Sequence, residues 1–361
     1  MWSLAILSGK RPGGQAMLKR RLGRTNLTVS VLGLGGGGFC RASQDESNRI
    51  IAHALAHGVN FIDTAPNYGD SEDKIGIALG AQRKQFFLAT KIEELTRDGA
   101  LRQLDSSLKR LRADCIDVWQ WHGILKPEQL DAIMSPGGAI EAMRKAKADK
   151  AVRFIGITAH SPWLAMKSLK AAGDLDTVQI PFNVMRRQYG EDPALGLFDY
   201  CRRHDIGVII MKPVAAGRIT RNLSTALKFI FAHDIATAIP GAASVAEFAP
   251  DVQAAEEFEQ LSATERHGLT RDEVLLGQDC CRGCGYCLPC PAGMDVPALL
   301  RAEQCARVFG LTEWIREECD RLKVDTSKCA PCGECEKRCP FDVPVRARLE
   351  GAKAVFAKRP A

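Results

Sequence analysis

The stretch NFIDTAPNYGDSEDKIGIALGAQRKQFFLATKI, residues 60–92, decides the fold. It begins with the short apolar run NFIDTAP, continues with the helical periodicity of SEDKIGIALG, and ends in a second apolar run, FFLATKI. A strand, a helix and a strand in this order predict two parallel strands joined by a helix that covers them.

The same alternation extends from this stretch in both directions. Six further apolar runs each precede a helical stretch: VSVLGLGG (29–36), IDVWQWHG (116–123), VRFIGITAH (152–160), DTVQIPFNV (176–184), GVIIMKPVAAG (207–217) and IATAIPGAAS (235–244). Runs such as GVIIM are typical of strands buried on both faces. Eight units predict an α/β fold with a closed (β/α)8 TIM barrel. A doubly wound open sheet is the alternative, but GLGGGGF lacks a G-x-G-x-x-G turn that opens a helix with an acidic residue about 20 positions on.

Composition limits the number of domains and the class of function. The chain has 361 residues, 46% hydrophobic and 25% charged, so it has room for one large and one small globular domain. A net charge of +6 without a Lys/Arg-rich block argues against nucleic acid as a partner. No apolar run approaches the roughly 18 residues of a membrane span, and residues 1–16 read as a flexible extension rather than a secretory signal.

The cysteines are concentrated in one part of the chain. Of the fourteen, eleven lie between Cys280 and Cys339, and only Cys40, Cys115 and Cys201 precede them. A secreted protein would rarely place its disulfides in one tail of a barrel-sized chain. Regular C-x-x-C spacing indicates a metal centre instead, and we therefore expect a protein of the reducing cytoplasm.

Polar side chains stand at the ends of three consecutive predicted strands. They are an acid, a phenol, an ammonium and an imidazole: Asp63, Tyr68, Lys91 and His122. In a barrel of this type, the carboxyl ends of the strands form the active-site rim. Each residue alone would be read as a packing or ion-pair residue, but their joint occurrence at one rim predicts a catalytic site.

These motifs resemble the aldo-keto reductases. The resemblance extends from about Met17 to Phe258 and includes LGRTNLTVSVLGLG (22–35), FIDTAPNYG (61–69), ATK (89–91), a histidine closing the fourth strand, QIPFN (179–183) and IPGAAS (239–244). It implies a nicotinamide-dependent oxidoreductase acting on a small carbonyl or alcohol, with a catalytic tetrad of Asp63, Tyr68, Lys91 and His122.

The residue types suit carbonyl reduction. Hydride transfer to a carbonyl requires a proton for the developing alkoxide, and Tyr68 would donate it. The Lys91 ammonium, anchored by Asp63, would stabilise the phenolate that remains. His122 would donate a hydrogen bond to the carbonyl oxygen and orient the substrate.

The resemblance is less complete at the positions it implies for the cofactor, NADP or NAD. Those positions are Thr158 and Gln179 for the nicotinamide amide, Lys212 and Gly217 for the pyrophosphate, and Gly241 in the loop after the last strand. Ala159 stands where the family has an asparagine. Glu247 stands about where the family often has an arginine for the 2′-phosphate of NADP, and a carboxylate there would suit a free ribose hydroxyl.

Two cysteine motifs indicate a second kind of site. Cys329-x2-Cys332-x2-Cys335-x3-Cys339-Pro340 has the bacterial ferredoxin spacing, and Cys281-x2-Cys284-x2-Cys287-x2-Cys290-Pro291 is one residue shorter before its last cysteine. In two-cluster ferredoxins the fourth cysteine of each run ligates the other cluster. We therefore expect two [4Fe-4S] clusters, one on Cys281, Cys284, Cys287 and Cys339, the other on Cys290, Cys329, Cys332 and Cys335.

Two other metal chemistries use similar spacings. Zinc binds thiolates of this kind, but two sets of four cysteines and the prolines after the fourth favour iron–sulfur. Cys280-x3-Cys284-x2-Cys287 has the radical-SAM spacing, but it follows the eighth strand rather than the first.

The segments around these motifs predict helices. PALLRAEQCARVFG (297–310) and LTEWIREECDRLK (311–323) read as two amphipathic helices with Cys305 and Cys319 as packing residues, and AEEFEQLSATERHGLTRDEV (255–274) as an acidic helix. The tail therefore resembles a small, mainly helical ferredoxin-like domain. We expect an extension at 1–16, a barrel at 17–262, a cluster domain at 270–350 and a tail at 351–361.

Three hypotheses for the function remain open. The first is an oxidoreductase whose clusters transfer electrons, with a redox protein as a possible partner. The second is an electron-transfer iron–sulfur protein whose barrel mainly binds a cofactor or a partner. The third is a reductase with structural clusters. The complete tetrad favours an enzyme, whereas the substrate cannot be read because specificity loops vary freely on this fold.

Overall fold

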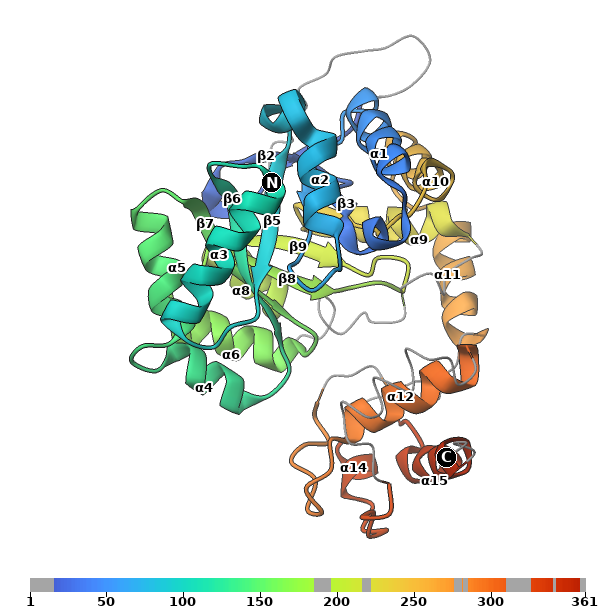
Figure 1. Ribbon diagram of the computed structural model, residues 1–361. Coiled ribbons are helices and arrows are strands. Elements are labelled where there is room, and N and C mark those ends of the chain that lie inside the picture. The colour runs from blue at the N-terminus through green and yellow to red at the C-terminus, as the bar shows by residue number, and fades with distance from the viewer. Residues whose placement is uncertain are drawn as a thin grey trace. The chain divides into compact units, whose positions relative to one another are not determined.

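The computed structural model describes residues 16–184, 196–215, 222–275, 281, 285–309, 326–339 and 342–357. The chain forms two compact units, Met1–Leu269 and Thr270–Ala361. Helices surround a sheet in the first unit, and the described elements of the second are helices and connecting loops (Figure 1).

The first unit is a closed (β/α)8 barrel, as the sequence predicts. Its strands are β3 (Leu34–Gly35), β4 (Phe61–Asp63), β5 (Phe87–Ile92), β6 (Ile116–Ile124), β7 (Val152–Ala159), β8 (Thr177–Pro181), β9 (Gly207–Met211) and β10 (Thr237–Ile239). They are parallel and pair in chain order. Parallel bridges from Leu32 to Ala238 and from Gly35 to Gly241 join the first strand region to the last and close the barrel.

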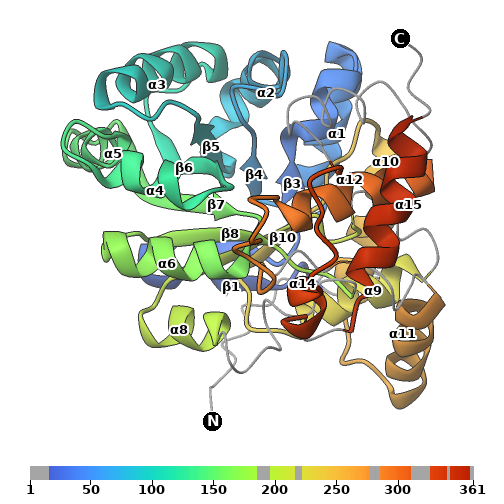
Figure 2. The same ribbon diagram turned by 90° about the horizontal axis from the view of Figure 1, so that it is seen from below.

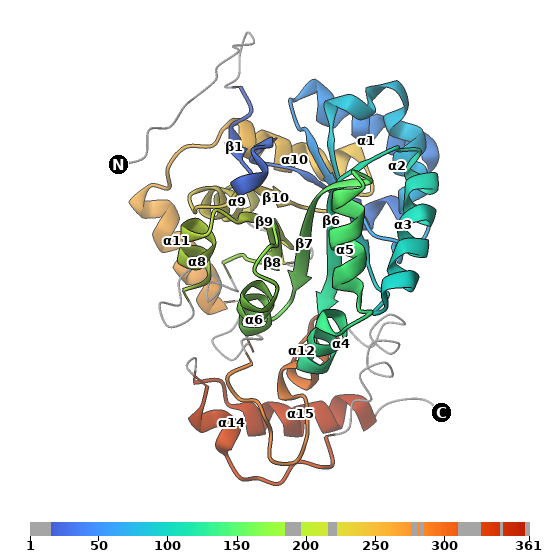
Figure 3. The same cartoon turned by 90° about the vertical axis from the view of Figure 1, so that its left-hand side faces the viewer.

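Helices cover the outside of the sheet (Figure 3). They are α1 (Gln44–Ala56), α2 (Ser71–Leu79), α3 (Arg97–Leu111), α4 (Pro127–Met134), α5 (Ala139–Ala148), α6 (Pro162–Ala172), α8 (Leu197–Arg203), α9 (Leu223–Phe231) and α10 (Val245–Glu256). Four of them begin after a serine or threonine whose side chain accepts a hydrogen bond from a backbone N–H of the first turn: Ser43, Thr96, Ser161 and Ser244. These hydroxyls satisfy donors that a helix start would otherwise leave without partners.

The first strand differs from the prediction. VSVLGLGG was expected to form one strand, but residues Thr28–Ser30 form β2, which pairs antiparallel with β1 (Lys19–Arg21) in a separate hairpin. Three side chains of this hairpin region, Leu22, Leu27 and Val29, are buried in one core cluster with Phe61 of β4 and Ala89 of β5. Burial of these apolar side chains explains why the chain forms the hairpin first and enters the barrel only at Leu32. The hairpin closes the N-terminal end of the barrel, and the opposite end is called the mouth below.

The acidic helix expected over residues 255–274 is also interrupted. Helix α10 ends at Glu256, and α11 occupies Ala263–Leu275. Ser262 starts the new helix, because its hydroxyl accepts from the Glu265 N–H while the Glu265 carboxylate accepts from the Ser262 N–H. This reciprocal capping box favours a helix start inside the segment that composition alone reads as continuous.

The second unit contains the cysteine motifs. Its described helices include α12 (Val296–Phe309), α14 (Glu334–Lys337) and α15 (Val345–Ala357), with α15 lying against both α12 and α14 (Figure 2). The helix expected at 297–310 is confirmed, and the one expected at 311–323 lies outside the described residues. Helix α15 runs without a break across the position expected to divide the cluster domain from the tail, between residues 350 and 351. Within the described part of the chain, no helix is long and apolar enough to cross a membrane.

Candidate functional site

The mouth of the barrel contains a buried ion pair. Lys91, at the end of β5, is 1% exposed, and its Nζ donates to Asp63 Oδ2 at 2.6 Å and to the backbone oxygen of Thr64 at 2.6 Å. Burial alone would lower the pKa of Lys91, but Asp63 and Tyr68 together outweigh it and raise the pKa above the ordinary value. Lys91 therefore carries its positive charge throughout the neutral range.

Tyr68 and His122 lie next to this pair. The turn after β4, closed by a hydrogen bond from the Tyr68 N–H to the Ala65 oxygen, places the phenol ring with its centroid 5.0 Å from Lys91 Nζ. The imidazole of His122, near the end of β6, meets the Tyr68 ring edge-on, with the two centroids 5.7 Å apart. The structure thus brings the four candidate catalytic side chains together at one end of the barrel.

A carboxylate that the sequence analysis did not select also lies at His122. Glu93 Oε1 is 3.5 Å from His122 Nδ1 and accepts a hydrogen bond from Asn67 Nδ2 at 2.5 Å. Burial, the largest influence, lowers the pKa of His122, and the Glu93 carboxylate opposes this without reversing it. His122 is therefore a neutral imidazole at pH 7. Glu93 follows Lys91 by two positions, so strand alternation could have placed both on one face.

Gln120 is a second residue that the sequence analysis missed. It is fully buried on β6, and its Nε2 donates to Asp63 Oδ1 at 3.1 Å and to Gln179 Oε1 at 3.0 Å. The signal was a polar residue inside the apolar run DVWQW, two positions before His122 and so on the same face of the strand.

The candidate cofactor residues that the structure describes lie on or just after the strands that follow β6 around the barrel. Thr158 on β7 pairs in register with Gln179 on β8, and the Thr158 hydroxyl accepts from the Gly123 N–H at 2.5 Å. Lys212, just after β9, adopts the left-handed conformation, φ 54°, and its backbone oxygen accepts from Asn183 Nδ2 at 2.9 Å. A lysine in this strained region marks a loop whose shape the surrounding structure fixes.

Gly241 and Gly217 are the two glycines among the predicted cofactor residues. Gly241 forms the bridge to Gly35 that helps to close the barrel, and the nearest heavy atom to a Cβ placed on it would be 3.6 Å away. A Cβ at this position would therefore make only ordinary van der Waals contacts. Gly217 lies outside the described residues.

Glu247 has a local structural role at the start of α10. Its Oε2 accepts from the Ala243 N–H at 2.8 Å, and its own N–H donates to Ser244 Oγ at 3.1 Å. The Arg41 guanidinium lies 3.8 Å from the same carboxylate. Helix capping therefore accounts for this glutamate, and the nearby Arg41 guanidinium offsets part of the negative charge of its carboxylate.

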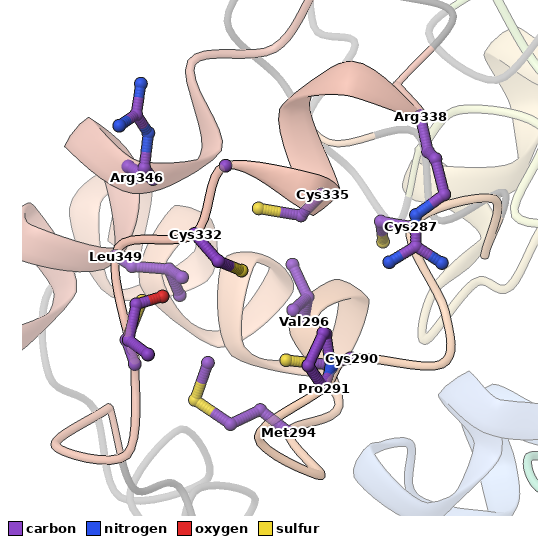
Figure 4. A pocket seen from close by; sticks show the side chains of 13 residues that line it. Cys287, Cys290, Pro291, Met294, Val296, Cys332, Cys335, Arg338, Arg346 and Leu349 are labelled. Carbon is purple, nitrogen blue, oxygen red and sulfur yellow. The ribbon is translucent and has the colours of Figure 1, made fainter.

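The cysteine motifs meet around one pocket in the second unit (Figure 4). Five cysteines line it, one pair from the first motif and three residues from the second: Cys287, Cys290, Cys329, Cys332 and Cys335. Met294, Val296 and Leu349 provide apolar walls, and Arg338 and Arg346 provide positive charge. In Figure 4 the side chains of Cys290, Cys332 and Cys335 enter the pocket from different sides, while Cys287 stands apart from them.

The remaining cysteines of the two motifs are placed as follows. Cys281 and Cys339 pack against the core of the second unit, formed by residues such as Val296, Leu299 and Val343. Cys284 lies outside the described residues, as do Cys280 and Cys319. Among the described residues, no three His, Cys, Asp or Glu side chains converge as ligands of one metal ion.

Comparison with known proteins identifies the first unit. A sequence profile of the aldo/keto reductase family matches residues 31–270, more than half of the chain. L-galactose dehydrogenase of Arabidopsis thaliana is 27% identical over 303 residues, which cover 71% of this chain and 93% of that protein. YqkF of Bacillus subtilis (strain 168), an uncharacterized oxidoreductase, is 29% identical over 221 residues, which cover 56% of this chain and 67% of its own.

Solved structures agree with the profile. The holo form of aldo-keto reductase AKR11C1 from Bacillus halodurans has a TM-score of 0.62 and 26% identity, covering 71% of this chain and 96% of that one. The aldo/keto reductase from Klebsiella pneumoniae in complex with NADP and acetate has a TM-score of 0.59 and 22% identity, covering 71% and 95%, and so shares the fold. With the profile spanning the barrel and the Lys91–Asp63 pair buried at its mouth, the chain belongs to the aldo/keto reductase family, whose members are NAD(P)-dependent oxidoreductases.

Proposed function

We propose that the barrel reduces a small carbonyl compound, or oxidises the corresponding alcohol, with Tyr68 as the proton donor. The observation that carries the proposal is the contact of Tyr68 with a buried, charged lysine on one side and a neutral histidine on the other. NADP or NAD supplies the hydride when it is bound.

The protein groups supply the proton and orient the carbonyl. As hydride reaches the carbonyl carbon, the oxygen gains negative charge and takes the Tyr68 proton. The Lys91 ammonium, held by Asp63 at 2.6 Å, stabilises the phenolate that this transfer leaves. His122 is kept neutral by burial and so has a single ring N–H. Its Nδ1 makes no hydrogen bond among the described residues, and with the proton on Nε2 the ring donates a hydrogen bond to the same oxygen without bringing a second cation into the site.

The cofactor would lie across the strands that follow His122. Thr158 and Gln179 would contact the nicotinamide amide, and Lys212, Gly217 and Gly241 the phosphate groups and the adjoining loop. Support comes from the named relatives, because the Klebsiella pneumoniae structure contains NADP and Aldo-keto reductase yakc of Schizosaccharomyces pombe carries NADP(+) in its name. We propose NADP or NAD as the cofactor. The Glu247 carboxylate caps a helix and lies near the Arg41 guanidinium, so its charge does not select between a 2′-phosphate and a free ribose hydroxyl.

Isotope transfer tests the reductase activity directly. The purified protein is incubated with NADPH deuterated at carbon 4, each face in turn, and with 4-nitrobenzaldehyde as the test carbonyl. We expect deuterium from one face only to appear at the new alcohol carbon. Consumption of NADPH without deuterium in the alcohol would contradict the proposal, and NADH treated in the same way measures the cofactor preference.

We also propose that the chain divides into a barrel, residues 17–262, and a ferredoxin-type domain with two [4Fe-4S] clusters, residues 270–350. The donor set fits, because four thiols of the second expected cluster, on Cys290, Cys329, Cys332 and Cys335, line one pocket. One of the four comes from the other motif, as the two-cluster ligation pattern requires. Arg338 holds this arrangement, since its Nη2 donates at 3.1 Å to the oxygen of Pro289, directly before Cys290.

The walls of the pocket also favour a cluster over a single ion. Thiolate-bound iron–sulfur clusters are large and anionic, and this pocket combines apolar residues with two arginines. Bound clusters would exchange single electrons.

Metal analysis of anaerobically purified protein tests the cluster proposal. Two four-cysteine sets predict about eight irons and about eight acid-labile sulfides per chain. Zinc in place of iron, or about four irons, would contradict the assignment. Titration with dithionite followed by EPR then separates the hypotheses for the clusters. If they transfer electrons to or from the barrel, directly or through a redox partner, their oxidation state changes when NADPH or the test carbonyl is added. Structural clusters do not respond.

A further inference from the structure

Gln120 connects the Asp63–Lys91 ion pair with Gln179, the candidate contact of the nicotinamide amide. It lies in the middle of β6, in register with Lys91 on β5 and with Gly156 on β7. Its Nε2 donates one hydrogen bond to Asp63 Oδ1 and another to Gln179 Oε1. Gln120 is 0% exposed, so it contacts the site only through these two residues and the barrel interior.

The chemistry of Asp63 fixes which way the Gln120 amide points. Asp63 is paired with Lys91 at 2.6 Å, and an ionised carboxylate can only accept hydrogen bonds. The Gln120 nitrogen must therefore face Asp63, and its second N–H is directed at Gln179. That N–H requires an acceptor, so Gln179 must turn its own oxygen toward Gln120. The amide nitrogen of Gln179 is then the atom left for a ligand.

The packing around Gln120 leaves the amide no other orientation. Gln120 Oε1 and Thr177 Oγ1 are both buried without a hydrogen-bond partner among the described residues. Between them lies Gly156, where an added Cβ would be 2.0 Å from Thr177 Oγ1 and 3.3 Å from Gln120 Cγ. The missing side chain provides the space for both polar side chains. Rotating the amide would turn its oxygen toward the Asp63 carboxylate and the Gln179 oxygen, which are both acceptors.

We infer that Gln120 is a positioning residue that orients Gln179 to donate, so that the site selects the carboxamide oxygen of the nicotinamide. The same side chain holds Asp63 against Lys91. This inference rests on the proposed cofactor contact of Gln179. It predicts a hydrogen-bond polarity for that contact, which the identity of Gln179 alone does not determine, because a glutamine can donate or accept.

A cofactor analogue tests the polarity without any substitution. In the 3-acetylpyridine analogue of NADP, a methyl group replaces the carboxamide nitrogen and the carbonyl oxygen is kept. If Gln179 donates to this oxygen, calorimetry will give a Kd within about threefold of that for NADP, because the hydrogen bond is retained. If Gln179 accepts from the carboxamide nitrogen, the analogue loses that bond. A Kd at least tenfold higher than that of NADP would overturn the inference.

The variant Gln120→Met tests the positioning role. It keeps the length of the side chain but removes both donors, so Gln179 can rotate and Asp63 loses a partner. We expect the Kd for NADP to rise about three- to tenfold, the value of one neutral hydrogen bond, and the turnover of 4-nitrobenzaldehyde to fall as well. Gln253→Met, at an exposed glutamine of α10, is the matched control and should change neither.

The outcomes separate this inference from the proposed function. Gln179→Ala weakens NADP binding if the cofactor contact is right. If Gln179→Ala weakens binding but Gln120→Met does not, Gln179 is a cofactor residue and the positioning role is wrong. If Gln179→Ala leaves the Kd unchanged, the cofactor assignment itself is wrong and the inference falls with it. Should Gln120→Met not fold, the analogue measurement on the unmodified protein still decides.

Discussion

The barrel mouth and the cysteine pocket assemble their functional groups in different ways. At the mouth, protein atoms alone complete the arrangement: the buried Lys91 is neutralised by Asp63, and Asp63 is held in turn by Gln120. Five thiols line the cysteine pocket, and the charged residues that line it, within the described part of the chain, are two arginines. The core of that unit is a small cluster of apolar residues against which six of the cysteines are buried or packed.

This difference indicates where each region obtains its stability. A barrel of this size buries enough apolar surface to fold without a ligand. Pairing of its strands in register then brings the site residues together at one end. A small helical unit whose core contains metal-binding thiols depends on the bound group for part of its folding free energy. We therefore expect the barrel site to exist in the apoprotein and the cysteine unit to require its clusters.

The largest expected effect is on catalysis by the preformed site. Tyr68→Phe removes only the proton donor, so the turnover of 4-nitrobenzaldehyde should fall by about 10²–10⁴-fold while the Kd for NADPH stays within about twofold. Lys91→Met should reduce turnover similarly, because it removes the cation that stabilises the phenolate. Tyr200→Phe, on the outer helix α8, is the control. Near-normal turnover in Tyr68→Phe would show that another group donates the proton.

The next effect distinguishes the two units by their metal content. Cys332→Ser should remove about half of the iron, and it should make the second unit sensitive to protease while the barrel stays intact. Cys115→Ser, at a partly buried thiol near the start of β6, should leave the iron content unchanged. Full iron content in Cys332→Ser, measured anaerobically, would exclude this residue as a ligand.

A buried carboxyl group of the barrel should make the free energy of unfolding depend on pH. Burial raises the pKa of Asp251 on α10 from 3.8 to about 7, and Asp251 has no hydrogen bond or ion pair with the described residues. The folded form therefore binds a proton that the unfolded form has released, and wild-type stability falls as pH rises from about 4 to 7. Relative to wild type, Asp251→Asn should gain on the order of 2–4 kcal/mol at pH 8 and almost nothing at pH 4.

Urea unfolding followed by tryptophan fluorescence measures this difference, since Trp119 and Trp121 are buried in β6. Asp105→Asn, at an exposed carboxylate of α3, serves as the control. An equal change at both pH values would mean that Asp251 does not titrate between folded and unfolded states as burial requires.

The smallest effect concerns the electrostatics at His122. Glu93→Gln removes the carboxylate that opposes the effect of burial, so the pKa of His122 should fall further below its ordinary value. NMR titration of the imidazole measures this pKa, with His122→Asn to assign the signal. Turnover at pH 7 should change less than about tenfold, because His122 is neutral in both forms. Glu94→Gln is the matched control, and an upward shift in Glu93→Gln would contradict the account.

The sequence predicted most of the barrel because its strands are short, apolar and separated by helical periodicity. It failed at VSVLGLGG, where residues 28–30 belong to a hairpin, since the apolar pattern does not show which partner a strand pairs with. It also failed at residues 255–274, where the Ser262–Glu265 capping box divides a segment of uniform composition.

The sequence predicted those residues of the candidate site whose side-chain type and position at a strand end are enough to indicate their chemistry. Asp63, Tyr68, Lys91 and His122 stand at strand ends with distinctive side chains, and the structure places them together. Gln120 and Glu93 were missed because their importance lies in contacts across strands, with Gln179 and His122, that no single run of sequence contains. The cysteine spacing predicted that the two motifs share one ligand set, and the pocket at Cys290 supports that proposal.

Hydrogen–deuterium exchange before and after iron removal tests the contrast between the two units most directly. The clusters are removed from anaerobically purified protein with ferricyanide and EDTA, and exchange is followed by mass spectrometry in both forms. We predict that α12 and α15 lose their protection, while the barrel strands β4 to β9 and the peptides that contain Lys91 and Gln120 keep theirs. Unchanged protection in α12 and α15, or equal loss in the barrel strands, would contradict the claim that only the cysteine unit depends on its clusters.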